Sequence, residues 1–174
     1  KLSNKSNIIF IPYVRSTNME FLQHYLPWQP KEKNQHRSIG FRSSIKNRTH
    51  KYQWIAGIDW EKTKGSLIEF QEFPFSQNQP QGKHYDYTVN SNTQAVFGHS
   101  TFNLTNSLAL DLGARFESTK YDYDNRLPDG SACSTEASNC RFSRPTDQVD
   151  RFSDLSLNLA ANFRLNSRQV VYFR

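Results

Sequence analysis

Several features that define common classes of protein are scarce or missing in this sequence of 174 residues. Methionine occurs once and cysteine twice. No apolar run reaches the roughly 18 residues of a transmembrane helix, and the N-terminal stretch KLSNKSN has no apolar core, so we expect no signal peptide in this chain. No Pro/Gly/Ser-rich linker or shift in composition divides it. The sequence therefore predicts a single domain over residues 1–174.

Groups that carry catalysis or bind cofactors are also scarce. The histidines are dispersed and have no metal-ligand spacing. His84-Tyr85-Asp86 and His99-Ser100 lack a positioned third partner for a hydrolytic site, so we expect no enzymatic activity, no cofactor and no metal. The 22 Lys and Arg residues outnumber the 16 Asp and Glu residues, but they are scattered along the chain. Because a phosphate footprint needs a basic patch, we expect no nucleic-acid partner.

What the sequence does contain is alternation, most clearly between residues 104 and 123. Apolar residues take every second position from Leu108 to Phe116, and Asp111, Arg115 and Glu117 lie among the residues between them. This period predicts a strand with one apolar and one polar face. The predicted strand runs from 107 to about 124, long enough to cross a bilayer core, which takes roughly 9–11 tilted residues.

The same alternation recurs along the chain and predicts an all-β fold, an antiparallel up-and-down meander of about seven long strands. If residues 105–107 form a turn, Phe102 lies opposite Leu110 and Val96 lies opposite Phe116. In this register the apolar residues of both strands share one face. The last strand is cut off by the end of the chain, so we expect a piece of a longer protein. The predicted strands are 8–15, 38–46, 52–70, 84–104, 107–124, 150–165 and one from 170 onward, joined by long loops at 17–35, 71–85 and 125–149 and short turns at 47–50, 105–107 and 166–167.

Two architectures share this pattern, because a soluble β-sandwich or lipocalin-like barrel also alternates apolar and polar residues. Strand length and the placing of all long loops at one end favour a transmembrane β-barrel. Aromatic residues near strand ends, at the positions of an interfacial girdle, favour it as well; these are Trp54, Trp60, Tyr121, Tyr123 and Tyr172.

Four stretches resemble the barrel of TonB-dependent outer-membrane receptors. In residues 96–125, VFGHSTFNLTNSLALDLGARFESTKYDYDN is similar to a mid-barrel hairpin of that family, with Leu110, Leu112, Gly113, Arg115 and Glu117 in or near the pattern L-x-L-x-x-G-x-R-x-E. The other stretches are IPYVRSTNMEFLQHYLP at 11–27, WIAGIDWEKTKGSLIEFQ at 54–71 and LNLAANFRLNSRQVVYFR at 157–174.

The resemblance implies part of a transmembrane barrel in the outer membrane of a Gram-negative bacterium, in contact with lipid. Such receptors import ferric siderophores or similar scarce nutrients with energy delivered by TonB. This sequence departs from the family in having neither the plug domain through which TonB acts nor enough strands to close a barrel. A passive porin-like channel and a soluble β-barrel or sandwich binding module remain the alternatives.

Specific residues follow from this interpretation. Cys133 and Cys140 are predicted to form a disulfide in an oxidising compartment, since no histidine nearby would complete a zinc site. Charged residues of both signs are predicted to face the lumen: Arg42, Asp59, Glu61, Asp111, Arg115, Glu117, Asp154 and Arg164. Aromatic and cationic residues of the long loops are the predicted ligand contacts: Tyr25, Trp28, Phe73, Phe75, Tyr85, Arg126, Arg141 and Arg144.

Overall fold

The computed structural model describes residues 6–133 and 139–173, and in this part of the chain every regular element is a strand. No helix in these residues is long and apolar enough to cross a membrane. The strands are β1 (Ser6–Leu22), β2 (Lys31–Arg48), β3 (Tyr52–Gln71), β4 (Gly82–Asn103), β5 (Leu108–Asn125), β6 (Gly130–Ser131), β7 (Ser143–Arg144), β8 (Gln148–Asn166) and β9 (Gln169–Phe173).

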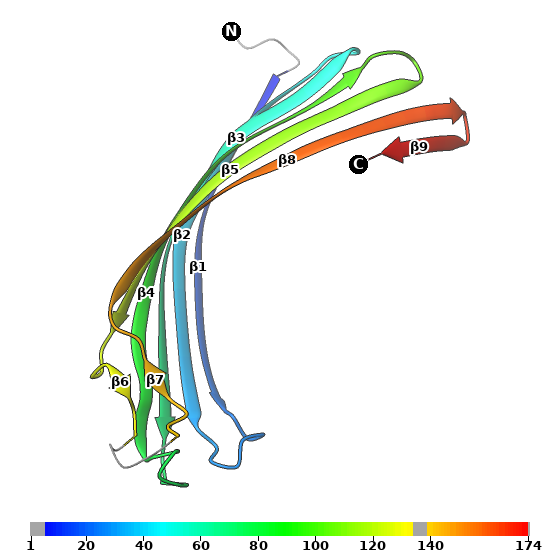
Figure 1. Cartoon of the computed structure of the whole chain (residues 1–174). Coiled ribbons are helices and arrows are strands. Elements are labelled where there is room, and N and C mark those ends of the chain that lie inside the picture. Colours follow the sequence, from blue (N-terminus) through cyan, green and yellow to red (C-terminus); the bar gives the residue numbers. More distant parts are fainter. Residues whose placement is uncertain (1–5, 134–138, 174) are drawn as a thin grey trace.

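Seven of these strands form one antiparallel sheet in the order β1-β2-β3-β4-β5-β8-β9, so each strand pairs with its neighbour along the chain. Figure 1 shows them side by side in a curved, strongly twisted sheet, with the short turns at one end and the long loops at the other. The predicted seven-stranded meander is confirmed.

The hairpin between β4 and β5 has the predicted register. Phe102 lies opposite Leu110 and Val96 opposite Phe116. The Leu104 amide donates to the Leu108 carbonyl at 2.9 Å, and the Thr105 hydroxyl oxygen accepts the Leu108 amide at 3.0 Å. The side chain of Thr105 thus closes the turn and holds the apolar residues of both strands on one face.

Two of the predicted loops are wrong in extent. Residues 17–22 and 31–35 are paired strand rather than loop, with Met19 opposite Asn34, and only residues 23–30 connect β1 to β2. The alternation of apolar and polar residues is weak in these two segments because neither face of this part of the sheet meets a uniformly apolar environment. The backbone groups are still paired, so the strands continue. The predicted loop at 125–149 contains β6 and β7, which form a separate two-stranded ladder.

The sheet has two chemically distinct faces and almost no core. Among the described residues the buried apolar side chains are Ala95, Phe142 and Pro30, whereas Leu157 is 75% exposed and Val14 is 72% exposed. We call the face that carries Leu157 and Val14 the outer face. Its apolar band consists of the outward residues within 8–14, 39–45, 54–60, 96–102, 108–116 and 155–165.

The opposite face, called here the inner face, is the one on which side chains converge. On it Tyr13 and Arg15 of β1 reach Glu61 of β3, and Arg115 of β5 reaches Asp59 of β3, each across an intervening strand. Side chains of strands two apart meet when a sheet curves toward them. In the described residues no outer-face hydrogen bond or ion pair joins strands two apart.

Of the five residues predicted to form a girdle, only the two tryptophans lie on the outer face. Trp54 and Trp60 lie on the outer face of β3, separated by roughly 20 Å at about 3.3 Å per residue. By register Tyr121, Tyr123 and Tyr172 lie on the inner face. The odd-numbered positions of β5 all face inward, so the two β5 tyrosines lie on the face opposite the apolar band.

Candidate functional site

The eight charged residues predicted to face the lumen share the inner face of the sheet. Arg42 lies opposite Asp59, and Glu117 lies opposite Asp154. The other four residues, Glu61, Asp111, Arg115 and Arg164, are placed on this face by the period-2 register of their strands.

Arg115 is the centre of an ion-pair network on this face. Its Nη1 donates to Asp59 Oδ2 at 2.8 Å and its Nη2 donates to Glu117 Oε2 at 2.8 Å. The guanidinium lies over the ring of Phe97, 5.8 Å from its centroid. One cation thereby bridges β3 and β5 and offsets the repulsion between Glu117 and Asp154.

Two glycines make room for these cross-strand contacts. Phe97 lies over Gly57, where an added Cβ would fall 2.5 Å from the ring and 2.4 Å from the Ser43 carbonyl oxygen. At Gly40 an added Cβ would fall 2.7 Å from the Tyr13 hydroxyl. The absence of a side chain at Gly40 lets Tyr13 cross β2 and donate to Glu61 at 2.6 Å.

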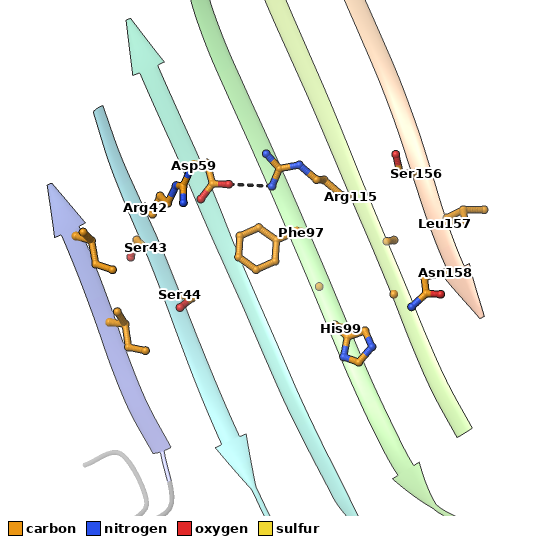
Figure 2. Close-up of a pocket in the computed structure, with 15 residues that line it drawn as sticks. Arg42, Ser43, Ser44, Asp59, Phe97, His99, Arg115, Ser156, Leu157 and Asn158 are labelled. Carbon is orange, nitrogen blue, oxygen red and sulfur yellow. Dashed lines mark hydrogen bonds and ion pairs between the residues drawn. The ribbon is translucent and has the colours of Figure 1, made fainter. Parts of the chain in front are cut away.

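A groove of about 720 Å³ lies beside this network. Arg42, Asp59, Phe97 and Arg115 line it at one end and His99 lies at the other, as Figure 2 shows together with the Asp59–Arg115 ion pair. Charged groups of both signs and one aromatic ring thus form a polar wall suited to binding another polar surface.

Beyond the apolar band, toward the long loops, the inner face becomes aromatic. Tyr87 and Tyr123 lie with ring centroids 5.1 Å apart, and Tyr121 and Phe152 lie 6.0 Å apart. Burial, followed by the charge of Glu32, raises the pKa of Tyr87, so its hydroxyl is protonated and can donate at neutral pH. The sequence interpretation missed this role because it placed Tyr121 and Tyr123 at the lipid interface.

At the long-loop end, three predicted contact residues from three loops form one cluster. The Arg141 guanidinium lies 4.9 Å from the ring centroid of Trp28, and Trp28 and Phe75 lie 6.0 Å apart. The buried Gln71 amide donates to the Trp28 and Phe73 carbonyl oxygens at 2.5 and 2.7 Å. The loops are therefore joined by a buried side chain rather than by surface contacts alone.

A second cluster surrounds Phe142, the one apolar residue between Cys140 and Val149. Its ring stacks on His84 at 3.7 Å and meets Tyr85 edge-on at 5.9 Å. His84 is fully buried, with Nδ1 2.9 Å from Glu69 Oε1 and Nε2 2.8 Å from the Pro80 carbonyl oxygen. His84 thereby connects Glu69 of β3 to the loop between β3 and β4.

Arg144 fixes the same loop to β4. Its Nε donates to the His84 carbonyl oxygen at 2.8 Å and its Nη2 donates to the Lys83 carbonyl oxygen at 2.6 Å. Burial, followed by the charge of Glu69, raises the pKa of Tyr85, so this hydroxyl is also protonated at neutral pH. Arg144 and Tyr85 thus serve to dock the loop.

The remaining predicted contact residues lie apart from these clusters. Tyr25 is 74% exposed and Phe73 is 70% exposed. Arg126 lies 3.8 Å from Asp86, a residue that faces outward on β4. Conversely, the sequence interpretation did not single out Gln71 or Phe142, and it gave His84 no structural role.

Cys133 and Cys140 are joined by a disulfide in the loop between β5 and β8. In the described residues, no group of three or more His, Cys, Asp or Glu side chains could hold a metal ion.

The comparison that bears on this arrangement is with protein families. Residues 5–174 match the family model described as "TonB dependent receptor-like, beta-barrel". The chain belongs to this family. Its sheet is accordingly part of a TonB-dependent receptor β-barrel. No curated protein matches the chain in sequence.

Solved structures agree with the TonB-dependent receptor fold. One is the "Copper transporter OprC", with a TM-score of 0.64 at 12% identity over 96% of this chain and 27% of that one. Another is the ferric-catecholate import receptor Fiu from E. coli K12 in its open form, with a TM-score of 0.62 at 11% identity over 98% and 32%. The chain thus spans about a third of the length of these receptors.

Proposed function

We propose that this chain forms part of the barrel wall of an outer-membrane receptor of a Gram-negative bacterium that imports a ferric siderophore or a similar scarce nutrient. The observation that carries the proposal is the two-faced sheet, in which an uncovered apolar band backs an inner face of networked charges. The first suits lipid, and the second suits a lumen that contacts a plug domain supplied by the rest of the receptor. No catalysis and no resident cofactor are part of this function.

In this proposal the inner face and the loops have different binding partners. The wall around Arg115 contacts the plug, through which TonB acts. Trp28, Phe75 and Arg141 offer stacking surfaces and a cation to an anionic aromatic chelate. The tyrosines at 87, 121 and 123 line the path between the two. The exposed Tyr25, Phe73 and Arg126 make secondary contacts, and the disulfide limits the motion of the loop that carries Arg141.

The test is uptake by cells whose only catechol receptor is the full-length protein containing this segment. A radiolabelled ferric tris-catecholate is the first probe and a copper salt is the second, because the structural neighbours are named for these cargoes. Accumulation of either probe that requires TonB supports the receptor. Accumulation that persists in cells without TonB would favour a passive channel instead.

A paired substitution tests the proposed contacts. Trp28→Ala with Arg141→Ala should weaken binding of the transported probe by roughly tenfold or more, as expected for the loss of a stacking and cationic anchor. Tyr25→Ala is the comparison variant and should weaken binding less, because that exposed ring lies outside the cluster and makes only a secondary contact. Equal binding by the paired variant and the comparison variant would remove the loop cluster from the ligand site.

A further inference from the structure

A second groove lies on the inner face, at the end of the sheet that carries the short turns. It has a volume of about 480 Å³. It follows two neighbouring rows of residues, in which Lys46 lies opposite Ile55 and Arg48 lies opposite Gln53. We call it the short-turn groove; its polar side chains on the inner face are Asn7, Lys46, Arg48, Gln53, His99 and Thr101.

The two fully charged side chains that line this groove are both cations. Lys46 and Arg48 are exposed, and in the part of the chain that the structure describes neither forms an ion pair. The groove beside the Arg115 network differs, because there Asp59 accepts from Arg115 at 2.8 Å. A cleft whose walls carry one sign of charge focuses the electric field and attracts ions of the opposite sign.

The carboxylate at the level of this groove does not neutralise its cations. Asp111 lies on β5 opposite Thr101, and it accepts hydrogen bonds from Thr101 and Asn162. β5 is three strands from β2 in the sheet, which is roughly 14 Å at about 4.8 Å per strand. This separation exceeds the Debye length of about 8 Å at physiological ionic strength. The charge of Asp111 is therefore largely screened from Lys46 and Arg48.

Neutral groups complete the groove. The side-chain amides of Asn7 and Gln53 lie in the same two rows as the cations, and Ile55 adds an apolar surface between them. Ammonium, guanidinium and amide groups all donate hydrogen bonds to carboxylate or phenolate oxygens. The groove also falls within the range of roughly 300–1,000 Å³ that is usual for small-molecule sites. Its chemistry suits a small anion rich in oxygen.

The short-turn groove continues from the groove beside the Arg115 network, because His99 lines both. Figure 2 shows His99 at the end of the first groove that lies away from Arg115. The inner face thus changes along one line from balanced charges to cations alone. In outer-membrane barrels the short turns lie on the periplasmic side, which is the side where an imported molecule leaves.

We propose that the short-turn groove binds an anionic cargo, a metal chelate with carboxylate or catecholate oxygens, at the periplasmic end of the lumen. Lys46 and Arg48 pair with its charged oxygens, and Asn7 and Gln53 donate to it. The inference rests on the proposed receptor function. It adds the sign of the charge on the cargo and a second contact, distinct from the loop cluster around Arg141 at the opposite end.

The test uses cells that express the full-length receptor. The groove variant carries Lys46→Gln and Arg48→Gln. The matched control, Lys51→Gln with Arg168→Gln, removes the same charge at the short-turn end from residues that do not line the groove. A charge-conserving variant carries Lys46→Arg and Arg48→Lys. The probe is radiolabelled ferric tris-catecholate, and the measurements are its binding to cells without TonB and its maximal rate of TonB-dependent uptake.

Uptake by the groove variant should reach a maximal rate at least roughly threefold below that of the wild type, as expected for the loss of two partly screened charge contacts. Binding to cells without TonB should be unchanged, because the loop cluster is intact. The control and the charge-conserving variant should match the wild type. Equal uptake by the groove variant and the control would overturn the proposal. Wild-type uptake of copper without ferric tris-catecholate would also overturn it, while leaving the receptor function in place.

Thermal unfolding of the purified full-length receptor gives a readout that does not depend on uptake. Citrate, a small carboxylate anion, should raise the unfolding temperature of the wild type and of the control but not of the groove variant. The rise should shrink as salt is added, because screening weakens exposed charges. An equal response in all proteins would overturn the proposal. A groove variant that unfolds earlier without citrate would also overturn it, by showing that Lys46 and Arg48 hold another part of the receptor.

Discussion

The inner and outer faces of this sheet handle charge in opposite ways. On the inner face the carboxylates of Asp59, Glu61 and Glu117 are each bonded by an arginine, so its charges are largely satisfied within the chain. On the outer face beyond the band, Lys33 pairs with Glu20, but Arg37 lies opposite Lys64 and Lys120 lies opposite Arg151. A surface whose charges are paired within the chain can contact a partner that is neutral or carries charges of both signs. A surface with unpaired like charges requires opposite charges from another molecule.

The largest expected effect comes from placing a charge where the outer face meets lipid. Leu157→Arg should cost about 2–4 kcal/mol of folding free energy in a bilayer, because the guanidinium would face hydrocarbon. Ser156→Arg on the inner face of the same strand should cost less than about 1 kcal/mol. Urea unfolding of the full-length receptor in lipid vesicles measures both. Equal costs would mean that the two faces are not lipid and lumen.

The next effect tests the close packing of the inner face. Gly57→Ala should destabilise the barrel by about 1–3 kcal/mol, since the new methyl would overlap the Ser43 carbonyl and the Phe97 ring. Gly65→Ala lies on the same face of the same strand, with its nearest atoms at 3.8 Å, and should be close to neutral. The measurement is again unfolding in vesicles, and similar losses for both glycines would contradict the prediction.

A smaller effect is expected from the ion-pair network itself. Arg115→Gln should cost no more than about 1 kcal/mol, because the guanidinium and its partners are partly exposed and screened by water. Combining it with Asp59→Asn tests the coupling, since the double variant should be less destabilised than the two single losses added together. Strict additivity would show that the pair contributes nothing.

The smallest effect on global stability is expected in the loops. Phe142→Ala should leave the unfolding free energy of the barrel nearly unchanged while accelerating amide hydrogen exchange in the loop between β5 and β8. The reason is that Phe142 packs against His84 and Tyr85 at the end of the sheet. Tyr25→Ala should leave exchange in this loop as it is. Unchanged exchange in Phe142→Ala would mean that the stacked ring does not hold the loop.

The sequence predicted the part of the fold that lipid imposes. Inside the apolar band, one side of every strand must be apolar, so alternation located the strands and the register at Val96 and Phe116. Beyond the band that constraint ends, and the paired segments at 17–22 and 31–35 carried no period to find.

The sites depended on contacts that no local pattern encodes. Phe142 and His84 are 58 residues apart and meet because the loop folds back onto β4. Arg37 and Lys64 are far apart in sequence and lie opposite each other only through the register of β2 and β3. By contrast, Arg115 and Glu117 were found easily, since their spacing of two places both side chains on one face.

The length of β4 affects how the long-loop end of the sheet responds to its surroundings. From Gln94, level with the Trp60 end of the apolar band, the strand continues to Gly82, on the order of 40 Å at roughly 3.3 Å per residue. This hydrogen-bonded stretch of β4 separates the apolar band from the loop clusters. Changes in membrane thickness or lipid order should therefore alter the sheet only near the apolar band. The hydrogen bonds of Arg144 to β4 and the stacking of Arg141 on Trp28 should stay the same.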